Sequence, residues 1–317
     1  MPISALTRNT LAGLALALPA LAVAQLSDGM SAPGPVVDAE WLLDNRDDVV
    51  VVNASRRPGN YADTGFVADA PFVGMGEFLT ERPGRQESIR YLMPSASDFE
   101  GVMQGLGVDA DDRVVIAPAG DAVYGDATVA SRLYWQMRYY GHDDVTILDG
   151  GVAAWSEAGG ETTRSPAAST GGGNFAAEES RDDLLATTDE VEAVIAGEAT
   201  ATLVDNRPLP QFTGVVSKDY VDGRGHLPEA EPLPFNLFVA PRDGIVYWRS
   251  PEAVQNIVSA MLPLTDGPII DYCNSGHVSS LAWFGMSEIG GMSDVALYDG
   301  SLHEWTLDGD RSLIIGR

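Results

Sequence analysis

The chain contains a long internal repeat, which constrains its fold more than any other feature. The segment LDGGVAAW at residues 148–155 returns as YDGSLHEW at residues 298–305. Three further pairs recur in the same order: VVVN at 50–53 with TLVD at 202–205, VVIA at 114–117 with PIID at 268–271, and YW at 134–135 with WF at 283–284. Solenoid repeats have periods of about 20–50 residues, whereas these features recur about 150 residues apart. The sequence therefore predicts a duplicated domain.

The second half alternates short apolar strands with helices. We expect strands at 203–204, 269–272 and 295–298, and helices at 189–196, 252–261 and 279–289. Ser250-Pro251 supports the second helix, because Ser is a common N-cap and Pro is favoured at the first helical position. Strand–helix alternation implies a parallel sheet covered on both faces. The predicted fold class is α/β, with two tandem domains that each contain a parallel sheet flanked by helices.

The first residues predict an export signal. Arg8 precedes an apolar run at 11–22 that is too short to span a bilayer, and Ala22-Val23-Ala24 has the pattern of a signal-peptidase site. We expect a periplasmic or extracellular protein with no stable membrane insertion after cleavage. The predicted organisation is a signal peptide at 1–24, an N-terminal domain at 33–164, a linker at 165–180 and a C-terminal domain at 181–317.

Charge and cysteine content exclude several classes of protein. The chain has 19 Lys and Arg against 46 Asp and Glu, for a net charge of −27. This charge argues against nucleic acid or anionic lipid as the main partner, because both require a basic surface. The single cysteine excludes a disulfide framework and a Cys-rich zinc site. That cysteine must be a free thiol or bond to another molecule, which makes it the first functional candidate.

Cys273 follows the strand expected at 269–272 and precedes the helix expected from 279. Ligands and catalytic groups of open α/β sheets gather at the carboxyl ends of strands. A loop that enters a helix there points successive backbone N–H groups at one spot, which would favour a thiolate. Gly276 permits the tight, left-handed backbone that such a loop needs. The alternative is a buried structural cysteine.

Four motifs occur in a fixed order along the chain. They are the loop CNSGHV at 273–278, the Asp-Gly turns followed by Trp155 and Trp305, DNR at 205–207 and GHLP at 225–228. Together they resemble the tandem rhodanese-like sulfurtransferases, the family of thiosulfate and 3-mercaptopyruvate sulfurtransferases, over residues 35–317. The first half has no cysteine in its corresponding loop at 117–121, as is usual for the first domain of tandem members.

The resemblance implies an enzyme that moves a sulfane sulfur through a persulfide on Cys273. This covalent, two-step reaction needs no metal and no organic cofactor. Arg207 would anchor the anionic end of the donor, because a guanidinium group binds sulfonate or carboxylate with two hydrogen bonds. The alternative for Arg207 is a surface or interdomain salt bridge. The other substrate-binding candidates are the loop residues Asn274, Ser275, Gly276, His277 and Val278.

The nature of the donor is open at this stage. The neutral pair Asn274-Ser275 is closer to the loop of the mercaptopyruvate enzymes, whereas His277 could add positive charge and an exported location favours thiosulfate. We expect thiosulfate as donor and cyanide or a thiol as acceptor, with 3-mercaptopyruvate as the alternative donor. A non-catalytic persulfide carrier or thiol sensor is a further alternative. A Cys-x5-Arg phosphatase is excluded, because position 279 is Ser.

Overall fold

The protein is described here from a computed structural model, which covers residues 34–84, 87–178, 180–263, 265, 267–307 and 309–316. Both copies of the repeat fall within these residues. The expected signal peptide at 1–24 lies outside them. In the part of the chain that is described, no helix is both long and apolar enough to cross a membrane.

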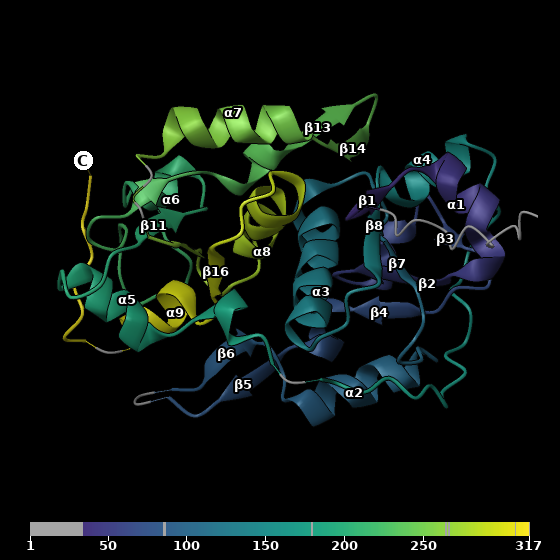
Figure 1. Ribbon diagram of the computed structural model, residues 1–317, viewed down its shortest axis with the longest axis horizontal. Helices are drawn as coiled ribbons and strands as arrows, with labels where there is room; N and C mark the ends of the chain where they lie inside the picture. The colour runs from purple at the N-terminus through teal and green to yellow at the C-terminus, as the bar shows by residue number, and fades with distance from the viewer. Residues whose placement is uncertain are drawn as a thin grey trace, which may run out of the picture. The chain divides into compact units, whose positions relative to one another are not determined.

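The first half is built on a five-stranded parallel sheet. In spatial order its strands are β1 (Val36–Val37), β8 (Val145–Leu148), β7 (Val114–Ala117), β2 (Val50–Ser55) and β4 (Phe72–Gly74). The helices of this half are α1 (Ala39–Asn45), α2 (Ala96–Gly105), α3 (Thr128–Tyr139) and α4 (Gly151–Glu157) (Figure 1). Alternate residues of β7 enter two different buried clusters. Because both faces of the sheet are covered, β7 is apolar throughout rather than alternating.

The second half repeats this sheet in the same order. Its strands are β10 (Leu185–Ala186), β16 (Val295–Tyr298), β15 (Ile269–Tyr272), β11 (Thr202–Asp205) and β12 (Glu231–Pro232), and all neighbours are parallel. Its helices are α5 (Thr188–Ile195), α6 (Leu209–Phe212), α7 (Pro251–Met261), α8 (Ser279–Trp283), which continues as a wider turn over Phe284–Ile289, and α9 (Ser301–Thr306). The matching order of strands confirms the predicted α/β class and the duplication.

The remaining strands form three antiparallel pairs, two of which join the halves. The pairs are β3 (Phe66–Val67) with β9 (Thr162–Thr163), β5 (Thr80–Arg82) with β6 (Ile89–Leu92), and β13 (Val239–Arg242) with β14 (Ile245–Trp248). The β5–β6 hairpin of the first half reaches α9 of the second half (Figure 1). Arg82 pairs there with Glu304. The β13–β14 hairpin of the second half reaches α4 of the first in the same way.

The halves also share a core between α3 and α8, which lie side by side (Figure 1). The Tyr134 ring meets the Phe284 ring edge-on at a centroid distance of 4.7 Å and lies 6.4 Å from the Trp283 ring. One buried apolar cluster runs through both helices and both sheets. Tyr134 and the second copy of the repeated aromatic pair, at 283–284, therefore form part of the contact between the two halves.

The segment expected as a linker lies on the surface of the first half. Phe175 is fully buried, and its ring contacts Phe99 edge-on at 5.7 Å and His142 at 5.5 Å. The Gln104 side chain donates a 2.8 Å hydrogen bond to the Phe175 carbonyl. The segment around Phe175 is therefore held in place by apolar burial and a hydrogen bond, as residues of the core are. The domain boundaries at 164 and 181 stay predictions.

Phe175→Ala should lower the free energy of unfolding by about 3–5 kcal/mol, because the change removes a buried ring and leaves a cavity. Ser169→Ala, in an exposed part of the same segment, is the matched control and should change stability by less than about 0.5 kcal/mol. Denaturant titrations of the three proteins measure the difference. Equal, small effects of both changes would show that the segment is a free tether.

Candidate active site

Cys273 stands directly after β15, at the start of the loop that leads into α8. Its side chain is almost fully buried. The backbone N–H groups of Cys273 and Gly276 both donate to the Ser301 hydroxyl oxygen, at 3.1 and 3.0 Å. Ser301 in turn donates to the Tyr298 carbonyl at 2.7 Å. A single hydroxyl therefore closes the loop into a tight turn.

Four other N–H groups of the loop have no acceptor among the described residues. They belong to Asn274, Ser275, His277 and Val278. The Ser279 hydroxyl points at the Cys273 sulfur, with an oxygen–sulfur distance of 3.4 Å. Backbone amides and a hydroxyl around one sulfur form a site for a negatively charged sulfur species.

Ser301 is a functional residue that sequence reasoning did not single out. It has φ +50°, an unusual backbone conformation for a residue with a side chain. The equivalent position of the first half is Gly151, which has φ +57° and no strain. The sequence does contain a signal for Ser301: the repeat has glycine at this position in the first half and serine in the second. The second half accepts this strain at the residue that organises the cysteine loop.

Gly276 is required by both its conformation and its surroundings. Its φ of +70° lies in the left-handed region, as the sequence predicted. A Cβ atom at this position would lie 2.6 Å from the Asp299 Oδ1 atom and 2.9 Å from the Arg132 Nη1 atom. No other residue type can occupy this position without moving the loop.

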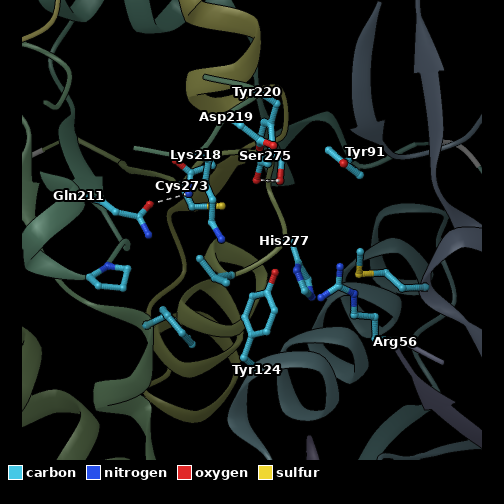
Figure 2. A pocket seen from close by; sticks show the side chains of 15 residues that line it. Arg56, Tyr91, Tyr124, Gln211, Lys218, Asp219, Tyr220, Cys273, Ser275 and His277 are labelled. Carbon is cyan, nitrogen blue, oxygen red and sulfur yellow. Dashed lines mark hydrogen bonds between the residues drawn. The ribbon is translucent and has the colours of Figure 1, made fainter. Parts of the chain in front are cut away.

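The loop opens into a cavity of about 570 Å³ between the two halves. Its lining residues are Arg56, Met75, Tyr91 and Tyr124 from the first half, and Pro208, Gln211, Lys218, Asp219, Tyr220, Phe235, Cys273, Asn274, Ser275, His277 and Val278 from the second. Figure 2 shows Arg56, Tyr91 and Tyr124 on one side of the cavity and Cys273 with Lys218 on the other. Both halves are therefore needed to enclose the cysteine.

Arg207 lies behind this cavity and not in it. It is 1% exposed and is paired with Asp205, at 2.5 Å between Nη2 and Oδ2. The same Nη2 atom donates to the Gly225 carbonyl at 2.7 Å, and Nη1 reaches the Asn274 side chain at 3.4 Å. The structure therefore places the expected donor anchor as a support beneath the loop, because a buried guanidinium group requires a carboxylate partner. The positive groups at the cavity are Arg56 and Lys218.

His277 lines the cavity as a neutral side chain. Burial, together with the positive charges of Arg132 and Arg56, lowers the pKa of His277 to about 3. Its ring lies 5.4 Å from the Tyr124 ring. The expectation that His277 could add positive charge therefore fails near neutral pH, because among the described residues no carboxylate offsets the cost of burying its charged form.

Asp271 is a buried carboxyl group on the strand that leads to Cys273. Its exposed fraction is zero, and neither carboxyl oxygen has a hydrogen-bond partner among the described residues. In the sheet it lies between Val204 and Leu297. Burial, and then the proximity of Cys273, raises the pKa of Asp271 well above its usual range. The group is therefore protonated in the native protein over a wide pH range.

Asp271→Val should stabilise the protein by about 1–3 kcal/mol at neutral pH, because it removes a buried polar group without partners. A raised native pKa makes the wild type lose stability as pH rises above the unfolded-state value of about 4. The stability gap between variant and wild type should therefore widen from pH 4 to pH 8. Denaturant unfolding at several pH values checks this, and a gap independent of pH would contradict the protonated state.

Comparisons with known proteins agree with this architecture. Residues 187–308 match the family described as Rhodanese-like domain. A thiosulfate sulfurtransferase of Gallus gallus is 28% identical over 68% of this chain and 71% of its own length. A 3-mercaptopyruvate sulfurtransferase of Escherichia coli K12 is 26% identical over 85% of this chain and 94% of its own. The solved structure of EanB with ergothioneine has the same fold, with a TM-score of 0.74 and 22% identity over 89% of this chain and 70% of that one.

The duplicated sheet, the cysteine loop and these relatives define a tandem rhodanese-type protein. Residues 187–308 match the rhodanese-like domain family, and relatives over most of the chain are thiosulfate and 3-mercaptopyruvate sulfurtransferases. The protein is a sulfur-transferring enzyme. The predicted resemblance is confirmed over the second half by the family match and over most of the chain by the relatives.

Proposed function

We propose that the protein takes a sulfane sulfur from thiosulfate, holds it as a persulfide on Cys273 and passes it to cyanide or a thiol. One observation carries this proposal: the only cysteine of the chain lies at a strand end where four backbone N–H groups have no acceptor in the described structure. The persulfide-carrier alternative is not favoured, because the relatives that span most of the chain are named as transferases.

The reaction consists of two displacements at sulfur. The Cys273 thiolate attacks the outer sulfur of thiosulfate, so that a sulfur–sulfur bond forms while the bond to the sulfonate sulfur breaks. Sulfite leaves with the electron pair of the broken bond. The terminal sulfur of the persulfide carries the negative charge, and the N–H groups of Asn274, Ser275, His277 and Val278 are available to stabilise it. The acceptor then attacks this terminal sulfur and regenerates the thiolate.

Two cations of the cavity support an anionic donor. Arg56 comes from the first half, and its guanidinium carbon lies 5.8 Å from the centre of the Tyr124 ring. Lys218 comes from the second half and lines the same cavity. Asp219 lines the same cavity, so the three charged side chains together carry one net positive charge, which suits an anionic donor. The neutral Asn274-Ser275 pair keeps 3-mercaptopyruvate as the alternative donor, and relatives of both names exist.

We also propose that the protein is exported. The support is the order of Arg8, the apolar run at 11–22 and the small residues at 22–24. N-terminal sequencing of the protein from its native host should find Gln25 as the first residue. An intact form that begins at Met1 and remains in the cytoplasm would contradict export.

Incubation with thiosulfate alone should add one sulfur atom to the wild type, a gain of ~32 Da by mass spectrometry, and cyanide should remove it. Cys273→Ser should lose both the adduct and turnover, because a serine hydroxyl forms no persulfide. Its stability should change by less than about 1 kcal/mol, since the substitution is nearly isosteric. Turnover at the wild-type rate in Cys273→Ser would refute the assignment.

Arg56→Ala should reduce kcat/KM for thiosulfate about tenfold, which corresponds to about 1.4 kcal/mol for a partly solvated charge contact. Arg57→Ala is the matched control, because Arg57 is the adjacent, exposed arginine and does not line the cavity. Steady-state kinetics with thiosulfate and with 3-mercaptopyruvate measure both effects and the donor preference. An equal loss in both variants would mean that only the general charge of the surface matters.

A further inference from the structure

A buried arginine of the first half reaches the cysteine loop of the second. Arg132 lies on α3 and is completely buried. Its Nη2 atom donates to the Asp299 Oδ1 atom at 2.5 Å, and its guanidinium carbon lies 4.8 Å from the centre of the Trp135 ring. Its Nε and Nη1 atoms have no hydrogen-bond acceptor among the described residues.

Arg132 and Asp299 together determine where Gly276 lies. A Cβ atom on Gly276 would stand 2.9 Å from the Arg132 Nη1 atom and 2.6 Å from the Asp299 Oδ1 atom, so both groups pack directly against its backbone. Asp299 is held from its other side by the Met93 N–H, which donates to Oδ2 at 2.9 Å. Gly276 precedes His277 and Val278, whose N–H groups have no acceptor in the described structure. The direction of these two N–H groups therefore depends on the Arg132–Asp299 pair.

The internal repeat shows that this arginine is not needed for the fold. Asp149 is the first-half equivalent of Asp299, and it accepts the Trp248 N–H at 2.9 Å just as Asp299 accepts that of Met93. The α8 position that corresponds to Arg132 is Leu281, and Asp149 forms no ion pair in the part of the structure described. Arg242 of the β13–β14 hairpin is near Asp149 but forms no ion pair with it among the described residues, so the turn and the hairpin contact form without a buried, paired guanidinium group. Among the described residues, a buried arginine pairs with the turn aspartate only in the half whose loop carries the cysteine.

We propose that Arg132 is a positioning residue for the Cys273 loop, so that the half without a nucleophile controls turnover in the half that has one. The inference rests on the proposed function, because the loop N–H groups matter only if a persulfide or its transition state binds them. Arg132 does not line the cavity, so its loss should affect the chemical step more than the binding of the donor.

Arg132→Met keeps the length of the side chain but removes its charge and hydrogen bonds. Its kcat with thiosulfate and cyanide should fall about tenfold to 100-fold, since small displacements of catalytic groups have effects of this size. KM for thiosulfate should stay within about twofold of the wild type. Arg132→Lys should recover part of kcat, because it restores the charge without the planar fork. A folded Arg132→Met protein with wild-type kcat would overturn the proposal, as would a rise in KM with kcat unchanged.

Asp299→Asn keeps an acceptor for the Met93 N–H but removes the ion pair with Arg132. This variant tests the same proposal if Arg132→Met does not fold. It should lower kcat by a similar factor. The double variant should lose little more than either single variant, because the two residues act as one unit. Asp149→Asn is the matched control at the equivalent turn and should keep wild-type kcat. Equal losses in Asp149→Asn and Asp299→Asn would overturn the proposal.

The mass of the wild type after thiosulfate treatment separates this inference from the proposed function. A wild-type protein that gains no sulfur on Cys273 contradicts the proposed function itself. A wild type that gains and discharges sulfur, with folded variants that do so equally fast, contradicts only the role of Arg132.

Discussion

Each half of the protein has an Asp-Gly turn at the end of a central strand, and the other half donates a backbone N–H to the aspartate of that turn. Met93 donates to Asp299, and Trp248 donates to Asp149, both at 2.9 Å. These reciprocal bonds attach a hairpin of each half to the strand ends of the other. Strand ends are where an α/β sheet places its ligands. The same contact that joins the halves therefore encloses the functional edge of each sheet.

Only one of the two enclosed edges has become a reactive site. In the second half a cysteine follows the strand, a serine replaces the glycine after the Asp-Gly pair, and a buried arginine pairs with the aspartate. In the first half, the loop at 117–121 has none of these features, and the Val246 N–H donates to the Gly120 carbonyl at 2.8 Å. The β13–β14 hairpin thus packs against the loop at 117–121, at the place where the second half has its cysteine loop and cavity. The first half contributes Arg56, Tyr91 and Tyr124 to the cavity beside the cysteine loop of the second half.

Much of the fold follows from local patterns. Apolar runs such as 269–272 identify the central strands, because strands covered on both faces are apolar throughout. The two-residue edge strands β10 and β12 and the hairpins carry no such signal. Ile89 and Leu92 of β6, for example, are buried against Leu307 of the other half, a contact that no local pattern predicts.

The site shows the same division between local and distant determinants. Cys273 and Gly276 could be identified from sequence, because the chemistry of a thiol and the backbone of a turn are local properties. Arg207 and His277 could not be placed correctly from sequence, because the burial of both, and the charges that face His277, are set by the tertiary packing. Arg207 pairs with a carboxylate two residues away, and His277 stays neutral beside two arginines of the other half. Arg56 and Arg132 act across the interface between copies, where sequence order gives no indication of distance.

The central claim is that sulfur is carried on Cys273 within a cavity that both halves build. A crystal structure of the wild-type protein soaked in thiosulfate tests it most directly. The account predicts density for one additional sulfur bonded to the Cys273 sulfur and facing Arg56 and Tyr124. This sulfur should lie within hydrogen-bond distance of the N–H groups of Asn274, Ser275, His277 and Val278. An unmodified Cys273 in protein that turns over thiosulfate, or a sulfur directed away from these N–H groups, would contradict the account.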